Sequence, residues 1–290
     1  MKKILNLYSY SLTYPALLIY FVFFVVPVGA GLAMAFTDWN LQNLLQPKFN
    51  GLDNFKIIVD DARFIKSLWN TLVFAFFTTV FKVMFGLLLA LALVQKLKLR
   101  SLYRSIFFFP AMLSVVVIGV IFTSVFQMGG LFDQLLNVFG IQAEINWLGQ
   151  GSTAMLVIIL TEIWQWSGVI MIIFIAGLMG IPTDYYEAAR IDGASWWGRF
   201  KHITFPLLAP AFTISVTISL VGGLKVFAIV YVLTNGGPGF STQVLSTYIF
   251  QAFTNGLLGR SSAMGLVLTV LVTSFTLVLN YFLRRREIEM

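Results

Sequence analysis

The sequence predicts an all-α integral membrane protein that crosses the bilayer with six helices. Hydrophobic residues other than glycine make up 59% of the 290 residues, whereas an ordinary soluble domain reaches about 45–50% even with glycine counted. Only 11% of the residues are charged, and these charges cluster between apolar runs. Each run reaches the roughly 20 residues that a membrane-spanning helix needs. The runs extend over residues 12–36, 68–94, 103–127, 153–181, 207–234 and 262–283.

The first run can be interpreted as a retained anchor or as a cleavable signal peptide. The segment Ala33-Met34-Ala35 resembles a cleavage site. The apolar stretch before it, however, is longer than the roughly 7–15 residues of a signal-peptide core. We therefore expect a retained anchor and a single transmembrane domain over residues 1–290. N-terminal sequencing that starts near Phe36 would contradict this expectation.

Basic residues in the short loops predict that both termini lie in the cytoplasm, because Lys and Arg favour cytoplasmic loops. They gather after the second, fourth and sixth runs, at Lys96, Lys98, Arg100, Arg104, Arg190, Arg199, Lys201, Arg284, Arg285 and Arg286. The segment after the third run carries Asp133 and Glu144 without Lys or Arg, and the segment after the fifth carries only Arg260. We expect these two segments outside. The net charge of +7 thus reflects topology, and we expect no nucleic-acid partner.

Catalytic and metal chemistry finds little support in the sequence. There is no cysteine, which excludes disulfides and thiolate metal sites. His202 is the only histidine. The sequence has no H-E-x-x-H and no paired-Asp motif. Glu162 is the one carboxylate inside an apolar run, and it lacks the second group that general acid and base catalysis needs. The sequence therefore predicts no catalytic residue and no metal site, and it argues against an intramembrane enzyme.

The longest polar interruption, residues 182–206, separates the fourth run from the fifth. Structureless loops beyond about 12–15 residues are uncommon, so we expect it to be ordered. Asp184 and Glu187 have the spacing of a capping box, and the residues from Tyr185 to Asp192 contain no helix breaker. We predict a short helix here.

A sharp turn and a second short helix should follow. Gly193 suits the left-handed position after a helix, and Ser195 can cap the next helix. That second helix should stop before Pro206. Physical reasoning alone leaves two roles open for the resulting hairpin: a solvated structure on the lipid headgroups, or a docking surface for a partner.

The residues of this hairpin resemble a known motif. The segment is similar to the EAA motif of the membrane subunits of ABC importers. Glu187-Ala188-Ala189 is followed after three residues by Gly193, and after nine more residues by Ile203 and then Pro206. Phe205 stands where that family usually has Leu. The resemblance implies that the hairpin docks into an ATP-hydrolysing subunit. The docking residues it implies are Glu187, Ala188, Ala189, Arg190, Asp192, Gly193 and Ala194.

A second set of residues narrows the resemblance to sugar permeases of the maltose and glycerol-phosphate type, which implies the type I ABC importer permease fold. The stretches that carry it are Ile163-Trp164-Gln165-Trp166, Ala176-Gly177-Leu178, Arg190-Ile191-Asp192-Gly193-Ala194, Leu233-Thr234-Asn235-Gly236-Gly237-Pro238-Gly239, Ser241-Thr242 and Ser262-Ala263-Met264. By itself the Gly-rich stretch predicts only a tight turn. The resemblance implies that Asn235, Gly236, Gly237 and Pro238 contact an extracytoplasmic solute-binding protein.

The resemblance also implies the partners. They are a second homologous permease subunit, with a heterodimer favoured, two ATP-hydrolysing subunits, the solute-binding protein and a carbohydrate substrate. The chain has no G-x-x-x-x-G-K-[ST] loop, so we expect no cofactor in this chain and ATP with Mg²⁺ in the partner subunits. The implied location is the cytoplasmic membrane of a prokaryote.

Polar and aromatic residues inside the apolar runs are candidates for substrate contact, since ionisable groups in a membrane are costly and usually face a cavity or a partner. The candidates are Glu162, Trp164, Gln165, Trp166, Lys225 and Phe227, with Lys82 as a third intramembrane charge. Gly222 and Gly223 can let the fifth run kink or unwind. Two interpretations stay open: these groups contact a ligand, or Glu162 and Lys225 pair with each other or across the permease dimer while the tryptophans pack helices. Sugar permeases often carry Asp where this chain has Ala228.

An ion-coupled secondary transporter is the alternative function, with Glu162 as the coupling carboxylate. Such folds are often built from repeats in a longer chain, and this sequence shows no internal repeat. The sequence does not specify the sugar. Disaccharides, oligosaccharides, uronate-containing glycans and glycerol phosphodiesters are all compatible with it.

Overall fold

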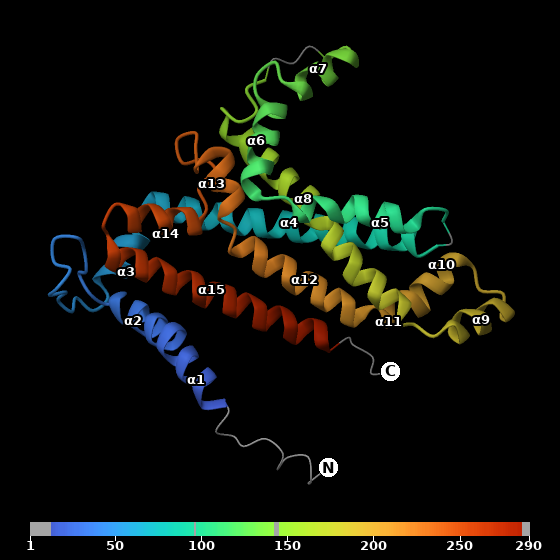
Figure 1. Cartoon of the computed structure of the whole chain (residues 1–290), viewed down its shortest axis with the longest axis horizontal. Coiled ribbons are helices and arrows are strands. Elements are labelled where there is room, and N and C mark those ends of the chain that lie inside the picture. The colour runs from blue at the N-terminus through green and yellow to red at the C-terminus, as the bar shows by residue number, and fades with distance from the viewer. Residues whose placement is uncertain (1–12, 96, 142–144, 286–290) are drawn as a thin grey trace, which may run out of the picture. The chain divides into compact units, whose positions relative to one another are not determined.

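The computed structural model describes residues 13–95, 97–141 and 145–285. Every regular element within these residues is helical, and their one strand-like feature is an isolated bridge between Thr37 and Phe49. The all-helical prediction is thereby confirmed for this part of the chain (Figure 1). Residue 12 at the start of the first run, together with Lys96, Glu144 and Arg286, lies outside the described residues.

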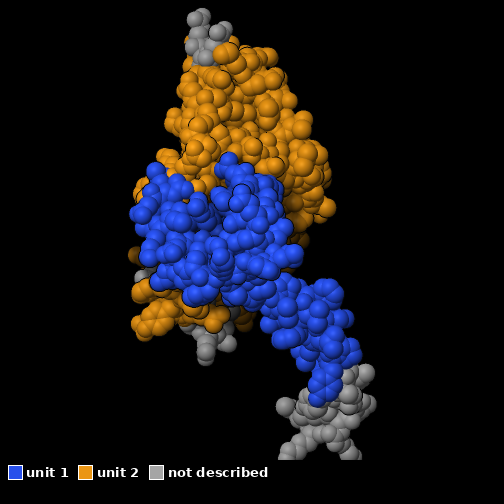
Figure 2. Space-filling view, turned by 90° about the vertical axis from the view of Figure 1, so that its left-hand side faces the viewer, with its two compact units in different colours: residues 1–62, 249–267 blue, residues 63–248, 268–290 orange. Residues whose placement is uncertain are grey.

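The chain separates into two compact units (Figure 2). Unit 1 contains residues 1–62 and 249–267, and unit 2 contains residues 63–248 and 268–290. All the predicted docking, substrate-contact and outer-loop residues belong to unit 2.

Unit 1 contains a continuous apolar helix from Tyr14 to Met34, which matches the first predicted run. It comprises α1 (Tyr14–Tyr20), η2 (Phe21–Val25) and α2 (Val26–Met34). The short helix α3 (Asp53–Val59) is held by its buried Asn54, whose amide donates to the carbonyl oxygens of Ala35 at 2.9 Å and Thr37 at 2.7 Å. This bond pair closes the loop that follows α2.

Unit 2 is built on three long helices, α4 (Ala62–Val94), α8 (Gly151–Met179) and α12 (Ala209–Leu224). Its shorter elements are α5 (Arg100–Phe108), η3 (Phe109–Met112), α6 (Val115–Phe126), α7 (Leu131–Val138), α9 (Thr183–Ile191), α10 (Trp196–Arg199), η4 (Phe200–Thr204), α11 (Phe205–Leu207) and α13 (Ala228–Thr234). Two further helices, α14 (Leu245–Thr254) and α15 (Leu258–Arg284), have residues in both units.

Four helices in the described residues are long and apolar enough to cross a membrane, or six if each of two bent pairs counts as one span. The four are Tyr14–Met34, Ala62–Val94, Gly151–Met179 and Leu258–Arg284. The lengths of four predicted runs are therefore close to those observed, and the other two predicted runs, 103–127 and 207–234, coincide at least in part with the two bent pairs.

The third run, 103–127, bends by 97° between η3 and α6. Pro110 lies in η3, and Ser114 begins α6 by accepting a hydrogen bond from the N–H of Val116 at 3.3 Å. Proline removes one backbone donor, and a serine cap gives the next helix its own start. Together they break a run whose composition alone indicated one helix.

The fifth run, 207–234, is interrupted twice. A 65° bend separates the helical segment Trp196–Leu207 from α12, and α12 ends at Leu224 before α13 starts at Ala228. The second break comes directly after Gly222 and Gly223, the two residues expected to let the helix unwind.

Two buried apolar clusters support α4 and α8. One cluster includes Phe74 and Ile158, and the other includes Val83 and Ile170. The helices approach closely in the second cluster, where a Cβ on Gly86 would lie 2.6 Å from a side-chain carbon of Ile170. Along the sequence, Lys82 of α4 and Glu162 of α8 lie between residues of the two clusters. The packing of both clusters therefore fixes the positions of these two side chains.

Candidate functional site

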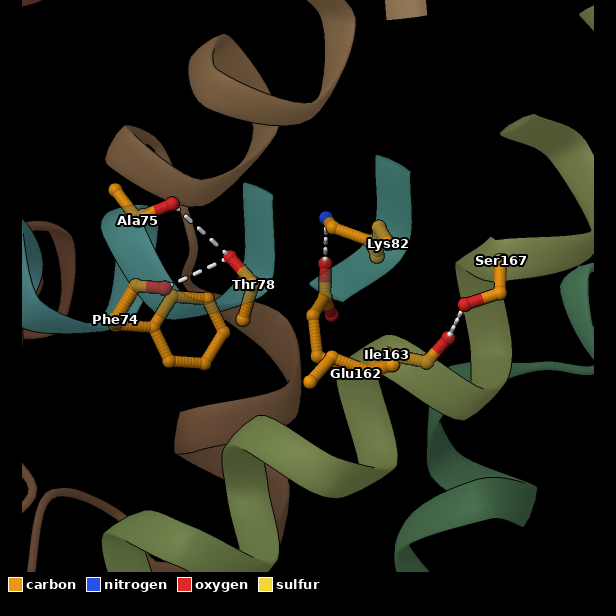
Figure 3. A network of polar contacts seen from close by, with 7 residues as sticks. All are labelled: Phe74, Ala75, Thr78, Lys82, Glu162, Ile163 and Ser167. Atoms are coloured by element: carbon orange, nitrogen blue, oxygen red, sulfur yellow. Dashed lines mark hydrogen bonds and ion pairs between the residues drawn. The ribbon is translucent and has the colours of Figure 1, made fainter. Parts of the chain in front are cut away.

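A buried ion pair joins α4 to α8. The Nζ atom of Lys82 lies 3.2 Å from Oε1 of Glu162 (Figure 3), and the two residues are 3% and 7% exposed. A buried charge is costly unless a partner compensates it. The interpretation in which Glu162 pairs with Lys225 is wrong, because Lys82 binds the Glu162 carboxylate instead.

A cavity of about 470 Å³ opens beside this ion pair. It is lined by five of the six predicted substrate-contact residues, Glu162, Gln165, Trp166, Lys225 and Phe227, and by Lys82. We call it the central cavity. Its volume falls in the range of about 300–1,000 Å³ that is usual for ligand pockets.

Trp164 is the predicted residue that the structure places elsewhere. Its ring packs against Phe122, with 5.2 Å between the ring centroids. Glu162, Gln165 and Trp166 follow the i, i+3, i+4 spacing of one helical face. Successive residues turn by about 100°, so Trp164, two positions after Glu162 and one before Gln165, points away from this face.

The break between α12 and α13 brings Lys225 to the central cavity. Its backbone N–H donates to the carbonyl oxygen of Val221 at 3.1 Å, so Lys225 caps the end of α12. A positive charge is favourable at a helix C-terminus. Gly223 lets α12 approach α4 closely here, since a Cβ at this position would lie 2.8 Å from the Cα of Ala75.

Sequence reasoning missed one polar residue of the central cavity, Ser219. It is 2% exposed, it lines the cavity, and its Oγ has no hydrogen-bond partner among the described residues. A serine in an apolar helix usually bonds back to a carbonyl of the preceding turn. Thr78 does so with Phe74 at 2.8 Å (Figure 3). The sequence feature that could have indicated Ser219 is its position one helical turn before Gly222 and Gly223, the glycines expected to interrupt the helix.

The hairpin predicted for residues 182–206 is present, and its turn has the expected geometry. Gly193 has a φ of +74°. The N–H of Ala194 donates to Ala189 at 2.8 Å and the N–H of Gly193 donates to Arg190 at 3.1 Å. These two bonds form a Schellman motif, which ends a helix with a left-handed residue. We call residues 182–206, from α9 through this turn and α10 to η4 and the start of α11, the hairpin.

Two details of the hairpin differ from the prediction. Asp184 does not cap α9: the N-cap position belongs to Pro182, and no side chain bonds there. Asp184 lies in the first turn instead, where its charge still favours the helix dipole.

The second helix also continues past Pro206, contrary to expectation. Ser195 caps α10 as predicted, accepting a bond from the N–H of Gly198 at 3.1 Å. A π-helical turn, η4, then follows and leads into α11, where Pro206 lies in the first turn. Pro206 has no backbone N–H to donate, and the helical segment ends one residue later, at Leu207.

Most predicted docking residues are exposed. Glu187, Ala188, Arg190, Asp192 and Gly193 are exposed, whereas Ala189 and Ala194 are half-buried. Glu187 and Arg190 form no ion pair with each other in the described part of the chain. Between them and the turn, Ile191 is 87% exposed. The hairpin thus presents an apolar and charged surface that no described residue covers.

The hairpin is anchored on its inner side by one hydrogen bond. The hydroxyl groups of Tyr186 in α9 and Thr204 in η4 lie 3.0 Å apart. Figure 1 shows α9 and α10 at the end of α8 and α12 that lies away from α13. The hairpin therefore connects two helices that both line the central cavity.

The predicted outer loop follows α13 and is tightly closed. Asn235 and Gly236 have φ values of 48° and 83°. The hydroxyl of Thr242 donates to the carbonyl oxygen of Gly237 at 2.7 Å, and the amide of Asn70 in α4 donates to Ser241 at 2.8 Å. These bonds leave Asn235 and Pro238 exposed, Gly237 half-buried and Gly236 buried.

No group of three or more metal-ligating side chains occurs among residues 13–95, 97–141 and 145–285. The polar groups of the central cavity are instead two ammonium groups, a carboxylate, an amide and a hydroxyl beside aromatic rings. Such groups hold an organic ligand through hydrogen bonds and ring contacts.

Comparisons with known proteins agree on one family. The family model "Binding-protein-dependent transport system inner membrane component" matches residues 82–288. A probable starch degradation products permease of Thermoanaerobacterium thermosulfurigenes is 34% identical, over 95% of this chain and 94% of its own length. The trehalose/maltose permease of Thermococcus litoralis is 33% identical, over 93% and 91%.

Solved structures give a similar result. A bacterial ABC transporter that imports the acidic polysaccharide alginate matches with a TM-score of 0.84 and 26% identity, over 95% of this chain and 94% of the other. The complex of such an alginate transporter with a pentasaccharide-bound periplasmic protein matches with a TM-score of 0.83 and 25% identity, over 95% and 93%.

Proposed function

The chain belongs to the family of binding-protein-dependent transport system inner membrane components, and from that premise we propose that it is the permease subunit of an ATP-binding-cassette importer for a sugar or oligosaccharide. It is a multi-pass membrane protein and not itself an enzyme. The relatives named for starch products and for trehalose or maltose support a carbohydrate substrate.

The observation that carries this proposal is the connection between the hairpin and the central cavity. The hairpin joins the end of α8 to the start of α12. α8 supplies Glu162, Gln165 and Trp166 to the cavity, and α12 ends at Leu224, directly before Lys225, which also lines the cavity. A force on the exposed hairpin is therefore applied to two cavity walls at once, which is what alternating access requires.

The proposal includes a topology. Each bent pair of helices forms one span, giving six spans with both termini in the cytoplasm, and residues 1–290 work as one permease domain of the type I importer fold. The hairpin then lies on the cytoplasmic side, and the loop from Asn235 to Pro238 lies outside. The membrane is the cytoplasmic membrane of a prokaryote.

The proposal also includes partners. Two ATP-hydrolysing subunits with ATP and Mg²⁺ dock on the hairpin, through the motif from Glu187 to Ala194. A second homologous permease completes the membrane part, and an extracytoplasmic binding protein contacts the loop at Asn235, Gly236, Gly237 and Pro238. The alginate transporter solved with a periplasmic protein supports the last of these partners.

Transport by the reconstituted complex tests the proposal against the ion-coupled alternative. The four membrane-associated subunits are placed in vesicles with binding protein and radiolabelled saccharide. We expect uptake that requires both ATP and the binding protein and that persists after an ionophore removes the ion gradients. Uptake that continues without ATP but stops with the ionophore would overturn the proposal.

A further inference from the structure

We propose that the central cavity selects an anionic saccharide, bearing a carboxylate or a phosphate, and that Lys225 binds the anionic group. This inference rests on the proposed function, because it names the substrate class of the same site. Its basis is a positive charge in the cavity that the described chain does not neutralise.

The charges that line the central cavity do not balance. They are two ammonium groups and one carboxylate: Lys82, Lys225 and Glu162. Lys82 and Glu162 neutralise each other at 3.2 Å. No ion pair or hydrogen bond joins the Lys225 ammonium to another described residue. One net positive charge is left in the cavity.

The rest of the sequence offers no nearby counter-charge. Glu162 is the only Asp or Glu in the six predicted runs, and no Asp or Glu occurs between Asp192 and Glu287. Ala228, three residues after Lys225, lines the same cavity with a methyl group. The dipole of α12 favours a cation at Lys225, but it supplies only a partial charge. Lys225 is exposed, so a full counter-charge can reach it from outside the chain.

An ammonium inside the membrane region is costly unless an anion or water solvates it. A substrate with an anionic group supplies that partner only while it is bound, and charge-assisted hydrogen bonds are the strong ones. Lys225 also lies where α12 and α13 are interrupted, so a movement of either helix changes its position. The pairing can then differ between the states of the transport cycle.

The other lining groups fit the neutral part of a saccharide. Ser219 and Gln165 are each 2% exposed, and neither side chain has a hydrogen-bond partner within the described residues. They can bond sugar hydroxyls. The rings of Trp166 and Phe227 line the same cavity, and aromatic faces suit the C–H faces of a pyranose. An inorganic anion would leave these groups unused.

The test compares uptake of two saccharides of equal length, an oligogalacturonate and a neutral oligosaccharide, with a hexose phosphate as a third substrate. The complete transporter is reconstituted with one binding protein, so that any change between variants belongs to the permease. For the wild type we expect a higher kcat/KM for an anionic saccharide than for the neutral one. The oligogalacturonate and the hexose phosphate distinguish a carboxylate from a phosphate.

Two variants assign the selectivity to Lys225. Lys225→Gln should lower the kcat/KM for the anionic saccharide relative to the neutral one by about tenfold, the effect of losing a hydrogen bond to a charged group. Ala228→Asp should do the same by supplying an internal counter-charge. Ala228→Asn, of equal size without charge, is the matched control and should leave the ratio unchanged.

Three results would overturn the inference. One is a wild type that prefers the neutral saccharide, and another is an unchanged ratio in Lys225→Gln. The third is a Lys225→Gln complex that loses its second permease subunit on size-exclusion chromatography, because a carboxylate of that subunit would then be the partner. ATP-driven uptake of neutral saccharide alone removes this inference and leaves the proposed function intact, whereas absence of any ATP-driven saccharide uptake removes the proposed function.

Discussion

The central cavity and the hairpin are built in opposite ways. The cavity brings together residues that are far apart in the sequence, such as the buried pair Lys82 and Glu162 and the exposed Lys225. The hairpin presents neighbouring residues, Glu187 to Gly193, on an exposed surface. The difference indicates a division of work: the interior recognises the substrate, and the surface receives a partner's movement. Changes in one region should therefore leave the other's function intact.

The largest effect is expected from breaking the buried ion pair. Lys82→Met leaves the Glu162 carboxylate buried without a partner, which should lower the free energy of unfolding by about 3–5 kcal/mol. Thermal unfolding of the purified complex in detergent measures this loss. The double variant Lys82→Met with Glu162→Gln should recover most of this loss. A Lys82→Met protein as stable as the wild type would show that Lys82 and Glu162 do not form an ion pair in the protein.

The turn of the hairpin should be the next most sensitive position. No atom lies within 4 Å of a Cβ built on Gly193, so a side chain there meets backbone strain and no clash. Gly193→Val should lose the turn, because an L-residue in this conformation costs about 1–2 kcal/mol, and uptake should fall while selectivity between saccharides stays the same. Gly193→Asn is the control, since Asn tolerates this conformation. Normal uptake by a stable Gly193→Val protein would contradict the role of the hairpin.

The two tryptophans of α8 separate substrate contact from helix packing. Trp166→Ala should raise the KM for the saccharide by about two- to tenfold, as expected for loss of an aromatic contact of roughly 0.5–1.5 kcal/mol. Trp164→Ala should leave the KM unchanged, because this ring packs on Phe122 outside the cavity. Initial rates of uptake over a range of saccharide concentrations provide both values. An equal rise in both variants would assign both rings to packing.

The smallest effect is expected at Ser219. Ser219→Ala removes one neutral hydrogen bond to the substrate, worth about 0.5–1.5 kcal/mol, so the KM should rise by a few-fold at most. Ser215→Ala is a matched control, because Ser215 is also buried on α12 with an unpartnered Oγ in the described chain but does not line the cavity. If the two variants have the same KM, Ser219 does not bind substrate.

The hairpin was largely predictable because its signals are local. The left-handed turn at Gly193 and the cap at Ser195 each depend on a few consecutive residues. The two misses were also local: Pro182 takes the cap position assigned to Asp184, and a π-helical turn lets the helix pass Pro206.

The cavity was predictable only in part because its arrangement depends on tertiary packing. Sequence indicated which intramembrane polar residues matter, but it could not show that Lys82 binds Glu162 from another helix. The helical period of α8 does separate Trp164 from Trp166, and applying it would have excluded Trp164 from the site. Pro110 and Ser114 likewise lie at the 97° bend in the third run, which hydrophobic composition alone did not indicate.

The separation of coupling from recognition is tested most directly by one ratio, the number of ATP molecules hydrolysed per saccharide imported at saturating saccharide. It is measured in vesicles for the wild type, Gly193→Val and Trp166→Ala. We expect Gly193→Val to raise this ratio by about tenfold or more, a coupling loss of at least about 1.4 kcal/mol, while Trp166→Ala keeps the wild-type ratio. A ratio that rises equally in both variants, or in neither, would contradict the division of work between the hairpin and the central cavity.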